Sequence, residues 1–182
     1  MYLSTLKLWN FRKYGVATPR LELSQPALTL RFNPGLNLLV GENDSGKTTI
    51  LDAIRYVLLT QSREYVRVTP EDFFVKGTDE NTRTDNLRVE CRFVGFTVEE
   101  AGPFLEWLGI EKVGDRDTYY LRVWLTANRK GDQVEPEVRA GADDVGAQLA
   151  GPARDLLRVT YLKPLRDSDA ELTPGRDRKS VV

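Results

Sequence analysis

The sequence predicts an α/β protein whose mixed sheet includes several antiparallel strand pairs. Strand-like patterns cover 3–10, 87–94 and 118–127, and a glycine-rich loop separates an apolar run from a stretch with helical spacing. The 182 residues are enough for one domain with a sizeable core.

The composition is that of a soluble globular protein, with 41% hydrophobic and 29% charged residues and a net charge of −1. Contact with nucleic acid would therefore need a local basic face. The absence of histidine removes His-based general bases and His metal ligands, and the single Cys91 fits a reducing compartment. Apolar runs are far shorter than the roughly 20 residues of a membrane span, so we expect a cytoplasmic protein without membrane contact.

The first part of the chain predicts three strands and a helix. Residues 3–10 alternate, "ALTLRF" at 27–32 forms a second strand, and "LNLLV" at 36–40 is apolar enough to be buried on both faces of a sheet. From Lys47 onward apolar residues fall at helical spacing, which predicts an amphipathic helix.

The later part predicts further antiparallel strands. The alternation over 87–94 places Leu87, Val89, Cys91 and Phe93 on one face. Thr97, with Glu100 three residues on, predicts a capped helix. The strand at 118–127, the turn "NRKGD" and the strand "QVEPEVRA" form a hairpin in which Pro136 takes an edge position. A small-residue helix near 143–157 and a strand at 157–162 follow.

We expect one partial domain over 1–182. Its parts are strands, loop and first helix at 1–60, an irregular connection at 61–86, antiparallel strands and helices at 87–162, and a polar tail at 163–182 that suggests a truncated end.

The run "GENDSGKT", from Gly41 to Thr48, fits G-x-x-x-x-G-K-[ST] at every fixed position. Its glycines let backbone N–H groups surround a β-phosphate at the start of a helix, while Lys47 reaches the β- and γ-phosphates. The Thr48 hydroxyl completes the coordination of Mg²⁺, and Thr49 serves the α-phosphate end. The nucleotide-binding residues that we expect here are Gly41, Asn43, Asp44, Ser45, Gly46, Lys47, Thr48 and Thr49, with Thr48 also as metal ligand.

Hydrolysis needs more than this loop, namely a carboxylate at the end of a buried strand and a charge-stabilising group. No run of four apolar residues is followed by Asp or Glu. Asp143-Asp144-Val145-Gly146 matches a GTPase D-x-x-G, but no buried strand precedes it and the chain has no N-K-x-D segment. We therefore assign no catalytic residue.

The segments "LSTLKLWNFRKYG" and "GENDSGKTTILDAIRYVLL" together resemble the N-terminal ATPase lobe of the SMC-, Rad50- and RecF-like branch of ABC ATPases. "VTPEDFF" and "VTYLKPLRDSDAEL" are similar to the OLD (overcoming lysogenisation defect) family. Its members join such an ATPase to a C-terminal Toprim nuclease, and Gabija-type relatives act in defence against phage.

The resemblance implies ATP and Mg²⁺ as cofactors, a homodimer that sandwiches ATP, and DNA as a partner of the parent protein. Arg12 would lie near the nucleotide or the lobe interface, or be a solvated strand end. Asp72 could face the metal or cap a turn, Gln61 could be a Q-loop glutamine, and Lys163 and Arg166 could touch phosphates or solvent.

The chain departs from this family in what it lacks. The signature helix, the Walker B Asp-Glu pair and the switch His are not reached, and Asp167-Ser168-Asp169 is a Toprim-like D-x-D by letters alone. The sequence predicts the ATP-binding lobe of an OLD-like ATP-dependent DNA endonuclease, incomplete for hydrolysis by itself. Two alternatives stay open, a small P-loop phosphotransferase or kinase with 61–86 as its lid, and a non-catalytic ATP-binding regulatory module. A role in repair or in antiviral defence is equally open.

Overall fold

The computed structural model describes residues 1–16, 21–58, 67–149 and 151–161. Within them a seven-stranded sheet has the order β2-β1-β3-β5-β6-β7, with β4 paired to β5 off this path, and every pair is antiparallel. The strands are β1 (Tyr2–Trp9), β2 (Leu28–Arg31), β3 (Asn86–Val94), β4 (Leu108–Val113), β5 (Arg116–Lys130), β6 (Gln133–Ala140) and β7 (Ala147–Gln148). The helices are α1 (Lys47–Leu58), α2 (Val98–Ala101) and α3 (Gly151–Leu156), with 3-10 turns η1 (Pro70–Asp72), η2 (Glu80–Thr82) and η3 (Gly102–Phe104).

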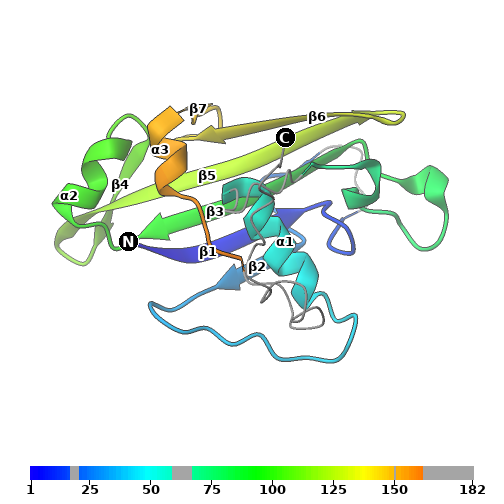
Figure 1. The fold of residues 1–182 in the computed structure, drawn as a ribbon, viewed down its shortest axis with the longest axis horizontal. Helices are drawn as coiled ribbons and strands as arrows, with labels where there is room; N and C mark the ends of the chain where they lie inside the picture. Colours follow the sequence, from blue (N-terminus) through cyan, green and yellow to red (C-terminus); the bar gives the residue numbers. More distant parts are fainter. Residues whose placement is uncertain (17–20, 59–66, 150, 162–182) are drawn as a thin grey trace, which may run out of the picture.

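One face of the sheet is apolar and carries the helices (Figure 1). The four alternating residues of β3, from Leu87 to Phe93, are buried on this face as expected, and the alternating apolar residues of β5 lie beside them. Helix α1 packs on β3 and β5 through Ile50, Val57 and Leu58, so the amphipathic helix is confirmed. The molecule therefore has two layers, with α1 held firmly against the sheet.

Several local predictions are confirmed. Strands β1 and β2 fall within a residue or two of the expected bounds. Thr97 accepts a hydrogen bond from the Glu100 N–H, while Glu100 accepts from the Thr97 N–H, which is the expected capping box of α2. Pro136 lies in β6 outside the stretch that pairs with β7, where its missing N–H costs no strand pairing on that side.

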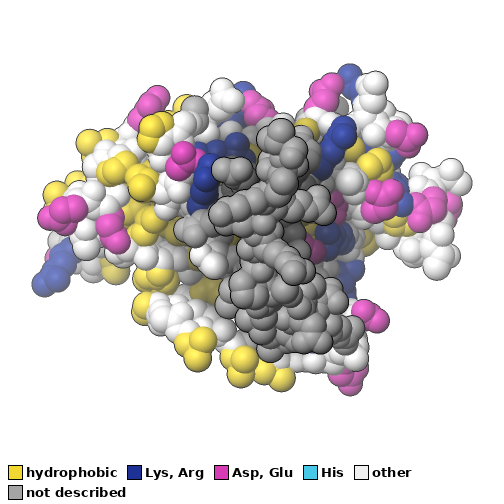
Figure 2. Space-filling view, in the orientation of Figure 1, with side chains coloured by type: hydrophobic (Ala, Val, Ile, Leu, Met, Phe, Trp, Pro, Cys, Tyr) yellow, Lys and Arg dark blue, Asp and Glu magenta, His cyan; other side chains and the backbone are white. Residues whose placement is uncertain are grey.

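The expected buried strand at 36–40 is wrong. These residues form no strand, and Leu36, Leu38 and Val40 are 95%, 82% and 84% exposed. The long connection from β2 to α1 runs outside the sheet, and hydrophobic side chains protrude along this lower edge (Figures 1 and 2). A strand needs a neighbour for its backbone hydrogen bonds, and the described residues provide none to this segment.

Other differences lie in the second half. Strand β4 has no counterpart in the prediction, because "LGIEKV" contains a glycine and alternates weakly. The expected helix at 143–157 shrinks to α3, which begins at Gly151, and no strand forms over 157–161. Gln61 and the tail residues Lys163, Arg166 and 167–169 lie outside the described residues. In the described part of the chain, no helix combines the length and apolar character that a bilayer crossing requires.

Candidate nucleotide-binding site

The phosphate loop, residues 41–48, leads directly into α1, whose first residue is Lys47. Gly46 has a φ of 103°, and a Cβ there would collide with the Tyr14 hydroxyl. A Cβ on Gly41 would come within 2.8 Å of Ser45 Oγ. The local geometry thus requires glycine at position 46, whereas a side chain at position 41 would displace the Ser45 hydroxyl.

Lys47 folds back over the loop. Its Nζ donates to the carbonyl oxygens of Gly41 at 2.7 Å and Glu42 at 2.5 Å, and lies 3.3 Å from Ser45 Oγ. These acceptors are neutral, so a phosphate oxygen can replace them with a stronger, charge-assisted bond.

A cavity of about 600 Å³ opens beside the loop. Its lining consists of Lys13, Asn43, Asp44, Gly46, Lys47, Thr48 and Thr49. Six of the eight expected nucleotide-binding residues therefore line one cavity. The other two, Gly41 and Ser45, accept hydrogen bonds from Lys47.

The residues of this cavity fit a nucleoside triphosphate. Two ammonium groups and two threonine hydroxyls meet at the N-terminus of α1, where the helix dipole also favours an anion. Among the described residues no cluster of carboxylate, thiol or imidazole groups could hold a metal by itself. The Thr48 hydroxyl, which lines the cavity, is the group that would hold a divalent cation bound with the phosphates.

The sequence prediction missed Lys13, which a tight turn delivers to the cavity. Phe11 and Tyr14 exchange backbone hydrogen bonds of 2.8 and 2.9 Å, which places Arg12 and Lys13 at the tip. Lys13 Nζ donates to the Asp44 carbonyl at 2.7 Å, and the Tyr14 hydroxyl lies 3.4 Å from the Ser45 carbonyl. The N-F-R-K run carried a signal, but only tertiary contact shows which basic side chain reaches the loop.

Arg12 points away from the cavity lining and joins β1, α1 and η1. Its Nη1 donates to Asp52 at 2.6 Å, its Nε to Asp72 at 2.8 Å, and its Nη2 to the Tyr56 hydroxyl at 3.3 Å. Burial by itself would lower the pKa of this guanidinium, but the hydrogen bonds to Asp72 and Asp52 outweigh it and raise the pKa. Its φ of 50°, rare outside glycine, is held in place by these bonds.

Asp72 caps a turn. Its Oδ2 accepts from the Thr69 N–H at 2.9 Å at the start of η1, and its Oδ1 accepts from Arg12. The carboxyl group is almost fully buried, which agrees with the turn-capping interpretation rather than with a metal-facing one.

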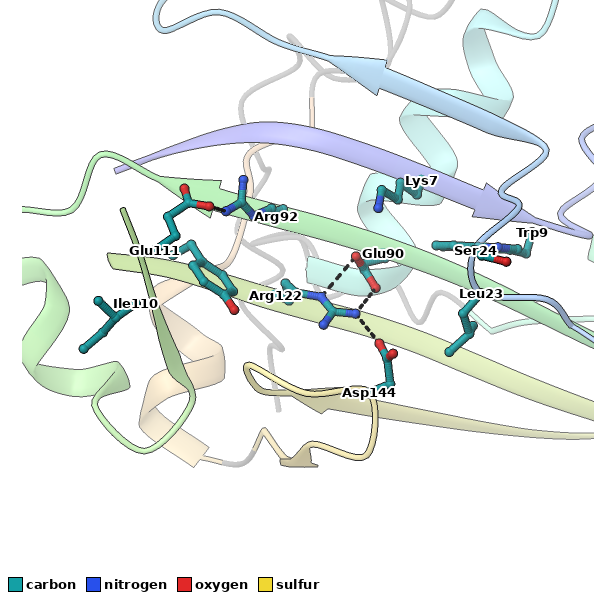
Figure 3. Close-up of a pocket in the computed structure, with 11 residues that line it drawn as sticks. Lys7, Trp9, Leu23, Ser24, Glu90, Arg92, Ile110, Glu111, Arg122 and Asp144 are labelled. Atoms are coloured by element: carbon teal, nitrogen blue, oxygen red, sulfur yellow. Dashed lines mark hydrogen bonds and ion pairs between the residues drawn. The ribbon is translucent and has the colours of Figure 1, made fainter. Parts of the chain in front are cut away.

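A second cavity, a trough of about 540 Å³, lies on the opposite, polar face of the sheet (Figure 3). Most of its charged side chains are paired within the protein. Arg122 binds Glu90 at 3.0 Å and also Asp144, while Arg92 binds Glu111. Asp144 belongs to the D-x-x-G match, so it serves an ion pair here, as the sequence argument against a GTPase motif would require.

A glycine loop at a helix N-terminus, with lysine and threonine side chains around a cavity, defines a P-loop nucleoside-triphosphate-binding protein. The chain belongs to the AAA domain family, whose sequence profile matches residues 5–135. The expected fold class, an ABC/SMC-like P-loop ATPase fold, is confirmed. The sheet of the described residues is antiparallel throughout, however, and not mixed as expected.

Relatives with known names match parts of the chain. The DNA replication and repair protein RecF of Symbiobacterium thermophilum is 39% identical over 99 residues, covering 50% of this chain and 23% of that protein. RecF of Pediococcus pentosaceus is 42% identical over 62 residues, covering 34% and 14%. The chromosome partition protein Smc of Mycobacterium leprae is 35% identical over 79 residues, covering 43% and 6%.

The chain spans less than a quarter of the length of these curated relatives. A solved chain from work on ATP-driven dimerization and DNA-stimulated activation of SMC ATPases aligns with 86% of this chain and 75% of its own length. The sequence identity is 18% and the TM-score is 0.48.

Proposed function

We propose that the chain is the ATP-binding N-terminal lobe of a longer DNA-acting ATPase. The observation that carries this proposal is the cavity in which Lys47, Thr48 and Thr49 meet at the start of α1. ATP with Mg²⁺ is the ligand that this cavity fits, and the family to which the chain belongs supports it.

Each residue of the cavity has a distinct task in this proposal. Lys47 binds the β- and γ-phosphates, the Thr48 hydroxyl holds the cation, and Thr49 donates at the α-phosphate. Mg²⁺, when bound, supplies charge neutralisation between the phosphates. Arg12 positions the site, because it fastens α1 to the turn that carries Lys13.

The proposal includes incompleteness for hydrolysis. The exposed row of Leu36, Leu38 and Val40 immediately precedes the loop, and such an apolar row calls for a covering partner. A further part of the parent polypeptide would cover it, and a second subunit would complete the ATP site. The relatives are named for DNA replication, repair and chromosome partition, which supports DNA as the partner.

Within this proposal the parent protein is an OLD-like ATP-dependent DNA endonuclease. The likeness of "VTPEDFF" supports it, and this segment builds the Thr69–Asp72 cap that receives Arg12. The kinase alternative is less well supported, because β1 and β2 both precede the phosphate loop. Asp72, a candidate for its catalytic carboxylate, is already bound by Arg12 and Thr69.

Lys47→Ala tests the nucleotide site. We expect ATP affinity to fall at least about a hundredfold, because the variant removes the charge that binds two phosphates. Titration calorimetry with Mg²⁺–ATP measures it, and Lys112→Ala, a lysine of β4 remote from the loop, is the control. Equal ATP affinity in the wild type and a folded Lys47→Ala variant would remove the proposal.

Two further parts of the proposal, the incomplete ATP-hydrolysis site of this chain and the endonuclease activity of the parent protein, have separate tests. The 182-residue chain should bind ATP but release no phosphate, and turnover that depends on Lys47 would show a complete site. The parent role is tested by weighing the native protein and incubating it with plasmid DNA and Mg²⁺–ATP. A native mass near 20.7 kDa with uncut plasmid would contradict the endonuclease.

A further inference from the structure

Lys13 is the one described residue from outside the phosphate loop and α1 that lines the nucleotide cavity. The Phe11–Tyr14 turn holds it there, since Lys13 Nζ donates to the Asp44 carbonyl at 2.7 Å. Its Cδ lies 3.0 Å from the point where a Cβ of Gly46 would stand. The ammonium group thus reaches the loop on the side of Asp44 and Gly46, whereas Lys47 reaches the carbonyls of Gly41 and Glu42.

The charge of Lys13 is left for a ligand. No ion pair joins Lys13 to a carboxylate within the described part of the chain. An ammonium group has three donors, and the structure uses one of them on a neutral carbonyl. The neighbouring Arg12 differs, since it forms ion pairs with Asp52 and Asp72.

Two lysines without carboxylate partners therefore face one cavity from different sides of the loop. A nucleotide with a chain of phosphates offers oxygen atoms to both lysines, because its charges extend along the loop.

We infer that Lys13 is a second phosphate-binding lysine of this site and binds the α-phosphate side of the nucleotide. Thr49, to which the proposed function assigns the α-phosphate, lines the same cavity, and Lys47 takes the β- and γ-phosphates. The inference rests on the proposed ATP site. On nucleotide binding, Lys13 Nζ exchanges the Asp44 carbonyl for a phosphate oxygen, which is the stronger partner.

The experiment compares the binding of Mg²⁺–ATP and Mg²⁺–ADP to four chains, the wild type, Lys13→Met, Lys13→Arg and Lys7→Met. For Lys13→Met we expect about a tenfold loss that is equal for both nucleotides, as for one charged hydrogen bond. Lys13→Arg should restore most of the affinity, and Lys7→Met, on β1 beside the trough of the opposite sheet face, should match the wild type. Wild-type affinity in Lys13→Met overturns the inference but not the ATP site, whereas a wild type that binds neither nucleotide overturns both.

Chemical protection separates direct contact from support of the loop. The wild-type chain is acetylated with and without saturating ATP, and the modified lysines are identified by mass spectrometry. ATP should protect Lys13 and Lys47 but leave Lys7 and Lys112 unchanged. Protection of Lys47 without Lys13 would show that Lys13 merely supports Asp44, and the inference would fail. A loss confined to ATP in the titrations would overturn the α-phosphate assignment.

Discussion

Two neighbouring basic residues take opposite roles in this chain. Arg12 donates to Asp52, Asp72 and Tyr56, whereas Lys13 meets a loop carbonyl and open cavity. The tight Phe11–Tyr14 turn makes the division, because it sends successive side chains in different directions. The sequence motif places both residues near the site. Only the fold shows that Arg12 binds other side chains of the protein, whereas Lys13 faces the cavity and is available to a ligand.

Arg12→Met should lower the unfolding free energy by about 2 kcal/mol. The change removes the partner of Asp72, a nearly fully buried carboxylate, and of Asp52. Urea denaturation of the nucleotide-free chain measures the loss, with Arg31→Met, an exposed position of β2, as the control. Equal midpoints for Arg12→Met and the wild type would contradict the structural role.

Among the helices and strands, the predictions that were confirmed rested on local sequence patterns. Alternation identified β1 and β3, and the Thr97–Glu100 pair identified the start of α2. The prediction of a strand at 36–40 was wrong, because an apolar composition does not show whether a neighbouring strand is present to pair with the segment. The same holds for the candidate site. The phosphate loop could be predicted because its residues are contiguous in sequence, whereas Lys13 lines the cavity only through the tertiary fold.

Leu38→Ser tests the exposure of this segment. We expect the unfolding free energy of the chain to change by less than about 0.5 kcal/mol, because Leu38 already faces solvent. Leu8→Ala, in the fully buried part of β1, should cost about 2–5 kcal/mol. Thermal unfolding of both variants gives the comparison. A Leu38→Ser loss as large as that of Leu8→Ala would mean that the segment is buried in solution.

Across the whole molecule, the sheet separates two kinds of stabilisation. Its helix-covered face is apolar, while its other face holds an ion network of Arg88, Glu90, Arg122 and Asp144. The Arg88 guanidinium also lies 4.5 Å from the centre of the Trp124 ring. This network ties β3 and β5 to the loop after β6, so the polar face contributes to stability through charge.

That contribution should depend on pH. Burial alone would raise the pKa of Glu90, but hydrogen bonds from Arg122 and Arg88 outweigh it and hold the pKa below its usual range. The hydrogen bond from Arg122 likewise lowers the pKa of Asp144. Both carboxyls therefore bind protons more weakly in the folded chain, and their stabilisation, present above a pH of about 4, is lost as the pH falls further.

Urea denaturation at several pH values between about 3 and 7 tests this dependence. The unfolding free energy should fall as the pH drops below about 4, and Glu90→Gln should weaken that fall. Glu135→Gln, on an exposed part of β6, serves as the matched control. Identical pH dependence in the Glu90→Gln variant and the wild type would contradict the role of the network.

The position of the exposed row has a thermodynamic consequence. Val40 and Gly41 are adjacent, so any chain that covers Leu36, Leu38 and Val40 also restrains the first glycine of the phosphate loop. Thermodynamic linkage is reciprocal. If a chain that covers this row raises the affinity for ATP by a given factor, bound ATP raises the affinity for that covering chain by the same factor. ATP would then act as an assembly signal, and its concentration would set how much of the chain is covered.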